Sequence, residues 1–327
     1  MNTRITCAQL AASLRQSNRS LQILQEIGLI EPIIHLYRKV MFMDESSRNG
    51  LELVACLIRK GIIDATHAAK SGHPGGSLGA ADIFTYLYFE EMNIDPQNPS
   101  MEERDRFVLS KGHTAPGLYA TLANRGFFPT QDLLTLRQPG SHLQGHPSMR
   151  LTPGIDMSTG SLGQGISAAC GMALGTKLKG ANNRVYALMG DGELGEGECW
   201  EAFMYAAHYK LDNLCVIIDI NGLQIDGATK DVMNTAPVDK KMQAFGFEVI
   251  HVDGHSFYSL ETGFRLARMT KGKPSVLIAK TIKGKGISFM ENNAGWHGKA
   301  PNDSEHAAAC AEIGAAYRVK GGSIDDF

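Results

Sequence analysis

The chain has 327 residues, of which 43% are hydrophobic and 20% charged, and its formal net charge is -2. This composition is typical of a soluble globular protein with enough length for a large buried core, in one large α/β domain or in two smaller ones. The charge argues against a nucleic-acid partner, and no apolar run reaches the ~18 residues that span a bilayer, so no membrane association is expected. A basic run at residues 280–285 is local, and we interpret it as a solvated surface.

The six cysteines occupy positions 7, 56, 170, 199, 215 and 310, and no two of them form a C-x-x-C pair. In a chain of this length, scattered cysteines are typical of free thiols in a reducing compartment. We therefore expect a cytoplasmic protein.

The first part of the chain differs from the rest. Residues 1–25 contain three arginines and no acidic residue; the first acidic residue of the chain is Glu26. This composition resembles a transit peptide, but we predict a small amphipathic helical extension over residues 1–47. Translation starting at Met41 or Met43 is a third possibility. No residue of this segment is predicted to be catalytic.

From residue 48 onward, apolar runs alternate with helical periodicity, and we treat residues 48–327 as one domain. Helices are predicted at residues 51–69, 80–89, 117–124, 198–209, 259–269 and 305–317, with a further helix of small residues that ends at 174. Strands are predicted at residues 107–110, 185–189, 214–220, 247–252 and 275–279. Loops are predicted at residues 71–76, 96–99 and 138–154. The alternation predicts an α/β fold with a parallel sheet that helices cover on both faces.

The stretch from Val185 to Gly227 is the most informative. It has the pattern of a strand, Gly-Asp-Gly, a helix, a strand and then Asn-Gly-Leu. Because a parallel βαβ unit takes about 30 residues, Asp191 and Asn221 are both expected just beyond the carboxyl ends of parallel strands, where open α/β sheets bind ligands.

These residue types suit a magnesium diphosphate. Mg²⁺ prefers oxygen ligands, which the Asp191 carboxylate, the Asn221 amide and the backbone carbonyl near Leu223 can offer. Gly190 and Gly192 leave room for backbone N–H groups to face phosphate. Alone, Gly-Asp-Gly is a common tight turn, so the spacing to Asn221 carries this prediction. A dinucleotide site is disfavoured, because residues 192–197 do not match G-x-G-x-x-G.

At this point the sequence resembles the thiamine-diphosphate enzymes, and transketolases in particular. The resemblance extends from about residue 48 to 305, in matching order. It rests on Gly-Asp-Gly through Asn221 and on five further motifs. These are K-S-G-H-P-G at 70–75, R-D-R-F-V-L-S-K-G-H at 104–113, G-H-P at 145–147, T-G-S-L-G-Q-G at 159–165 and W-H-G at 296–298.

The resemblance implies a role for each matching position. The metal ligands would be Asp191, Asn221 and the Leu223 carbonyl. The cofactor would contact the loop of Gly160, Ser161 and Leu162 and the diphosphate-binding group of His113, Gly190, Gly192 and Glu193. The implied catalytic residues are His73 and His146, facing the donor hydroxyls, His297, near both diphosphate and substrate, and Glu196. Glu196 and Glu201 match acidic positions that link two active sites across a dimer.

Histidine suits the reaction that the resemblance implies. Ketol transfer breaks a carbon–carbon bond next to a hydroxyl group, so a base must take the hydroxyl proton and later return it. Imidazole titrates near neutral pH and can do both. We therefore expect a transketolase that uses thiamine diphosphate with Mg²⁺, Ca²⁺ or Mn²⁺ and moves a two-carbon ketol group from a ketose phosphate to an aldose phosphate.

Two features resemble separately encoded amino-terminal transketolase subunits. Ser161 stands where many transketolases have proline, and Lys111 where the longer enzymes often have asparagine. The sequence after Pro301 is also too short for the pyrimidine domain and its activating glutamate. The resemblance therefore implies a partner subunit with that domain, in an assembly of two copies of each chain.

Two other interpretations stay open. A thiamine-diphosphate 2-oxoacid decarboxylase or dehydrogenase subunit would keep the cofactor and change the substrate. A non-catalytic thiamine-diphosphate-binding or regulatory protein would bind the cofactor without catalysing a reaction. The donor could be a pentose phosphate, a branched sugar phosphate or a sulfonated sugar, because the groups that hold its far end lie in the family's other domains.

Overall fold

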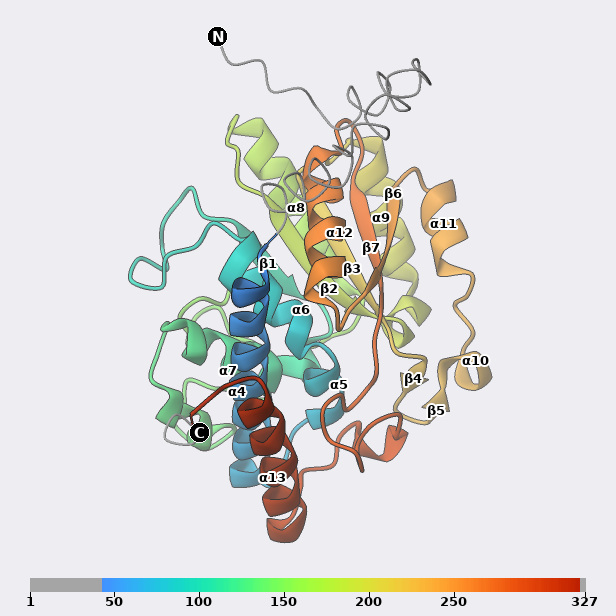
Figure 1. Cartoon of the computed structure of the whole chain (residues 1–327). Coiled ribbons are helices and arrows are strands. Elements are labelled where there is room, and N and C mark those ends of the chain that lie inside the picture. Colours follow the sequence, from blue (N-terminus) through green and yellow to red (C-terminus); the bar gives the residue numbers. More distant parts are fainter. Residues whose placement is uncertain (1–42, 324–327) are drawn as a thin grey trace, which may run out of the picture. The chain divides into compact units, whose positions relative to one another are not determined.

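A computed structural model describes residues 43–323 of the chain (Figure 1). The predicted extension over residues 1–47 falls almost entirely outside these residues. Its last three residues belong to α4 (Glu45–Ala69), the first helix of the described range, which begins six residues before the predicted start at 51. Within residues 43–323, no helix is long and apolar enough to cross a membrane.

Five parallel strands form the central sheet, as the sequence predicts. Their order is β1-β2-β3-β7-β6. The strands are β1 (Arg106–Leu109), β2 (Val185–Gly190), β3 (Leu214–Ile220), β6 (Glu248–Asp253) and β7 (Ser275–Lys280). A separate antiparallel pair, β4 (Leu223–Gln224) and β5 (Gly227–Ala228), was not predicted.

Most predicted helices are present, with longer or shorter bounds. After α4, the helices are α5 (Pro74–Gly79), α6 (Ala81–Tyr86), α7 (Ala115–Arg125), α8 (Gln164–Leu178), α9 (Gly197–His208), α10 (Thr229–Val232), α11 (Val238–Ala244), α12 (Phe257–Met269) and α13 (Asp303–Val319). The predicted helix at 80–89 ends earlier as an α-helix, because the chain widens into a π-helical turn at Leu87–Glu91. The predicted loop at 138–154 is a loop.

Helices cover both faces of the sheet, which confirms the predicted α/β architecture. On one face, alternate residues of the strands pack in a common core with α8, α9 and α11; Ala187, Val216 and Phe203 belong to it. On the other face, α6 and α12 supply aromatic side chains. Phe84 there contacts Phe107, and Phe264 contacts Tyr186. Because helices cover both faces, the inner strands β2 and β3 are buried over nearly their whole length.

A close contact brings the start of α8 against the end of β1. A Cβ atom at Gly165 would lie 2.6 Å from the Ser110 Cα atom, so only glycine fits there.

The five free cysteines of the described range are Cys56, Cys170, Cys199, Cys215 and Cys310. The free thiols match the prediction from their spacing.

Candidate active site

The site is built around Asp191 and Asn221, which the sheet places together. β2 and β3 are parallel neighbours, with Gly190 opposite Asp219 in the register. Their carboxyl ends therefore release Asp191 and Asn221 at the same edge. The Gly222 N–H, next in sequence to Asn221, donates to Asp191 Oδ2 at 2.6 Å. The predicted convergence of these two residues is present.

Backbone turns fix the orientation of both side chains. Asp191 Oδ1 accepts from the Gly192 N–H at 2.9 Å. Asn221 Oδ1 accepts from the Leu223 N–H at 3.0 Å, and its Nδ2 donates to Asp219 Oδ2 at 3.2 Å. Asp191, Asn221 and Leu223 all line one cavity. They form a set of oxygen donors of the kind that a hard divalent cation prefers.

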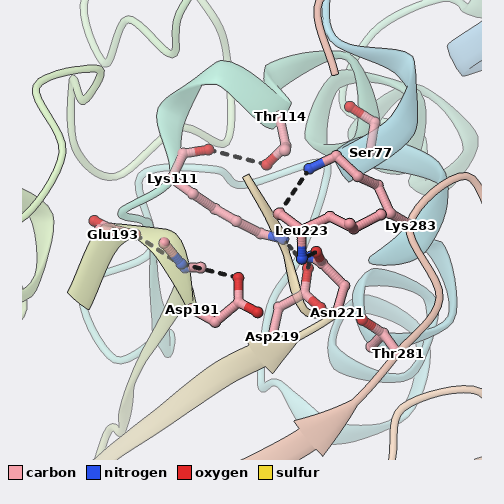
Figure 2. A network of polar contacts seen from close by, with 12 residues as sticks. Ser77, Lys111, Thr114, Asp191, Glu193, Asp219, Asn221, Leu223, Thr281 and Lys283 are labelled. Atoms are coloured by element: carbon pink, nitrogen blue, oxygen red, sulfur yellow. Dashed lines mark hydrogen bonds and ion pairs between the residues drawn. The ribbon is translucent and has the colours of Figure 1, made fainter. Parts of the chain in front are cut away.

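A buried ion pair lies beneath this pair and was not expected from the sequence. Lys111 and Asp219 form it, with side chains only 3% and 0% exposed. Figure 2 shows the Lys111 side chain extending toward Asp219 beside Asn221. Thr281 also donates to Asp219. Since Asp219 also accepts from Asn221, the ion pair helps to hold the Asn221 amide in place.

Lys283 corrects the interpretation of the basic run at 280–285 as a solvated surface. Its side chain is buried, lines the cavity and donates to the Leu223 carbonyl at 3.2 Å (Figure 2). Burial, followed by the charge of Lys111, lowers the pKa of Lys283 to about 8. A carbonyl oxygen has two lone pairs, so Leu223 can accept this bond and still face a cation.

The electrostatics of Asp191 favour a cation at this edge. Burial, and then the charge of Asp219, raise the pKa of Asp191 to about 6. A buried carboxylate whose pKa is raised in this way is stabilised in its ionised form by a nearby positive charge. The oxygen donors and the raised pKa both fit a divalent ion held by Asp191.

Three of the predicted histidines lie together in the cavity that Asp191 and Asn221 line. The ring centroids of His73, His113 and His297 are 5.1–5.4 Å apart. They come from three loops far apart in sequence. A Cβ atom at Gly75 would lie 2.7 Å from the Trp296 carbonyl oxygen, so the loops of His73 and His297 touch through their backbones.

The environment keeps these imidazoles neutral. Burial, then Arg137, lowers the pKa of His73 to about 4, and burial, then Lys283, lowers the pKa of His297 to about 4. Burial and Lys111 hold the pKa of His113 well below its ordinary value. At neutral pH each ring therefore has one nitrogen free to accept a proton.

These groups share a cavity of about 310 Å³. The predicted site residues that line it are His73, His113, Gly160, Leu162, Gly190, Asp191, Gly192, Glu193, Asn221, Leu223 and His297. His73 Nδ1, His297 Nδ1 and Gln224 Oε1 are buried and have no hydrogen-bond partner among the described residues. Unpaired buried polar atoms in a cavity indicate a polar ligand.

His146, Ser161 and Glu196 do not line this cavity. His146 lies beside it, because a Cβ atom at Gly160 would approach the His146 ring to 3.0 Å. Gly160 has a φ of +148°, a backbone conformation that a residue with a side chain adopts only at a cost in free energy. Ser161 and Glu196 are exposed.

Glu193 connects the loops that surround the cavity. One carboxylate oxygen accepts from Ser110 Oγ at 2.5 Å and from the Gly163 N–H at 3.0 Å. The other accepts from the Gly190 N–H at 3.0 Å. The resemblance predicts Glu193 near the cofactor, and these bonds show that its buried carboxylate joins the ends of β1 and β2 to the start of α8.

Comparisons with known proteins agree with this architecture. The family model of the transketolase thiamine diphosphate binding domain matches residues 52–320. A 6-deoxy-6-sulfo-D-fructose transketolase subunit of Clostridium sp. (strain MSTE9) is 45% identical over 80% of this chain and 96% of that protein. An apulose-4-phosphate transketolase subunit of Phocaeicola vulgatus is 43% identical over 80% of this chain and 93% of that protein.

Solved structures give the same result for the fold. The transketolase from Leishmania mexicana is 35% identical with a TM-score of 0.76, over 83% of this chain and 44% of that chain. The chain thus spans less than half of a full-length transketolase and nearly all of the subunit relatives. It belongs to the transketolase family, as a transketolase subunit built on the thiamine diphosphate-binding domain.

Proposed function

We propose that this subunit, with a partner subunit that carries the pyrimidine domain, transfers a two-carbon ketol group from a ketose phosphate to an aldose phosphate with Mg²⁺ as the metal. The observation that most supports this proposal is that three neutral imidazoles share one cavity with Asp191 and Asn221. A base that works on sugar hydroxyls and a cation-binding turn thus face the same space.

The carboxylate of Asp191, the amide oxygen of Asn221 and the Leu223 carbonyl would hold the Mg²⁺ ion. Mg²⁺ takes few protein ligands and completes its shell with phosphate oxygens and water. Lys111 and Lys283 line the same cavity, and their positive charges favour an anion there. A diphosphate bound through a cation fits both observations.

The histidines would handle the donor's hydroxyl protons. Thiamine diphosphate, when bound, supplies the thiazolium ring that accommodates the electron pair of the broken carbon–carbon bond. His73 and His297 have buried Nδ1 atoms without a partner among the described residues. A neutral imidazole there can accept a hydroxyl proton and return it. His146, which lies beside the cavity against Gly160, would contact another donor hydroxyl, and His113 would contact the diphosphate.

The partner subunit is supported by relatives that are themselves named subunits and that this chain matches over 93–97% of their length. We propose an assembly of two copies of each chain in the cytoplasm. Glu196 and Glu201 are exposed near the start of α9 and would meet the second copy there.

The relatives are named for a sulfonated fructose and for apulose 4-phosphate. For this chain, we propose a donor with the same ketose head and an anionic far end.

Reconstitution tests the proposal. The chain is coexpressed with a polypeptide that carries the pyrimidine domain and is assayed with ketose phosphates and with pyruvate. We expect ketol transfer from the ketose, none from pyruvate and none from either chain alone. Turnover of pyruvate would favour a 2-oxoacid enzyme. A stable complex that binds thiamine diphosphate but converts no donor would favour a non-catalytic protein.

A further inference from the structure

A cluster of metal-ligating side chains lies away from the active site, between α4 and α13. Asp64 comes from α4, and His306 and Cys310 lie one turn apart on α13. Figure 1 shows the two helices side by side. None of these three residues was predicted as a metal ligand from the sequence, because they come from segments more than 200 positions apart.

One oxygen of Asp64 is the centre of the cluster. His306 Nε2 lies 2.8 Å from Asp64 Oδ1, and Cys310 Sγ lies 3.8 Å from the same oxygen. The distance between Cys310 Sγ and His306 Nε2 is 3.6 Å. The other Asp64 oxygen accepts from Lys60 at 2.6 Å, so the carboxylate already presents Oδ1 to the two residues of α13.

Two of these separations are close to the edges of a metal tetrahedron. Bonds of about 2.0–2.2 Å from zinc to oxygen and nitrogen and of about 2.3 Å to sulfur imply ligand–ligand distances of about 3.3–3.7 Å. The Sγ–Nε2 distance of 3.6 Å falls in this range, and the Sγ–Oδ1 distance of 3.8 Å exceeds it by only about 0.1 Å. The third is a hydrogen bond that has to lengthen by about 0.5 Å when a metal replaces its proton. All three groups are partly exposed, so an ion can reach them and water can fill the fourth position.

We propose that Asp64, His306 and Cys310 bind a divalent ion of the zinc class. Thiolate and imidazole select borderline or soft ions, whereas Mg²⁺ and Ca²⁺ prefer oxygen ligands. The ion would join α4, which leads into the loop of His73, to α13, which follows the loop of His297. This second site is chemically distinct from the oxygen donors at Asp191, and it does not depend on the proposed function.

Cobalt titration tests the site. The untagged chain is freed of metal by chelation and titrated with Co²⁺ in excess Mg²⁺, and thiolate-to-cobalt absorbance is recorded. We expect a single equivalent of Co²⁺ with a thiolate band that Zn²⁺ displaces. The C310S variant should lose the band, and D64N and H306Q should weaken Co²⁺ binding by about tenfold or more. D64N is nearly isosteric, so the fold should persist.

Three control variants identify the ligands. C56A removes a different thiol, which lies on α4, H251Q removes an exposed histidine of β6, and D191N removes the carboxylate of the active site. All three should keep the band. If the parent chain shows no thiolate band, or if the band survives C310S, the cluster is a hydrogen-bonded contact between helices only. A band lost in C56A would assign the thiolate ligand to Cys56 instead. Either result overturns the proposal.

Discussion

The buried ion pair between Lys111 and Asp219 gives the sharpest prediction of stability. Replacing Lys111 with methionine keeps the apolar stem and leaves Asp219, which is 0% exposed, without its counter-charge. Removing one partner of a buried pair costs about 3–5 kcal/mol. Asp219 would still accept from Asn221 and Thr281. We therefore expect K111M to lose about 3 kcal/mol of unfolding free energy, at the lower end of that range.

The pH dependence of this contribution has a defined sign. Burial acts to raise the pKa of Asp219, but the charge and hydrogen bond of Lys111, together with Thr281, hold it below its ordinary value. A carboxyl with a lowered folded-state pKa stabilises the fold above its unfolded pKa, and this stabilisation is lost as the pH falls through the folded value. The difference between parent and K111M should therefore shrink in acid.

Urea unfolding of the parent, K111M, D219N and the double variant is the assay. The double variant should lose less than the sum of the single variants by about 2 kcal/mol, since neither charge is then left alone. The matched control is K179M, because the Lys179–Glu102 pair is 71% and 78% exposed, so solvent screens it and its loss should hardly change the free energy of unfolding. Additive losses, or a K111M loss no larger than that of K179M, would refute the reasoning.

Three further predictions concern the cavity. D191N should abolish Mg²⁺-dependent binding of thiamine diphosphate in calorimetry of the two-chain complex, and unchanged binding would exclude Asp191 as a ligand. Because unfolded imidazoles gain protons near pH 6.5 and folded His73 and His297 only near pH 4, the chain should lose stability as the pH falls between these values. In urea unfolding at several pH values, the H73Q/H297Q double variant should lose less unfolding free energy than the parent over this pH range. A pH dependence equal to that of the parent would contradict this prediction. G160A should displace the His146 ring and lower kcat/KM about tenfold or more with the fold intact; parental kinetics would argue against that contact.

The convergence of Asp191 and Asn221 could be predicted because it follows from topology. A βαβ unit of the observed length puts two parallel strands side by side, and their carboxyl ends then share one edge. The three clustered histidines could be predicted only through the resemblance of whole motifs, since nothing local places loops from residues 73, 113 and 297 together.

Other features depend on packing that no local pattern contains. Lys111 and Asp219 are 108 positions apart, and each looks like an ordinary charged residue in the sequence. Lys283 sits in a basic run that is typical of exposed loops, yet the loops around it bury the side chain. The early start of α4 had a local signal, the acidic Glu45 in its first turn, which favours a helix N-terminus.

Anomalous diffraction from crystals of the two-chain complex with Mn²⁺ and thiamine diphosphate tests the central geometry most directly. One strong peak should lie within coordination distance of the Asp191 carboxylate, the Asn221 amide oxygen and the Leu223 carbonyl, beside the diphosphate. A diphosphate bound with its ion on other residues, or a peak out of reach of Asp191 and Asn221, would contradict the assignment of this edge of the sheet.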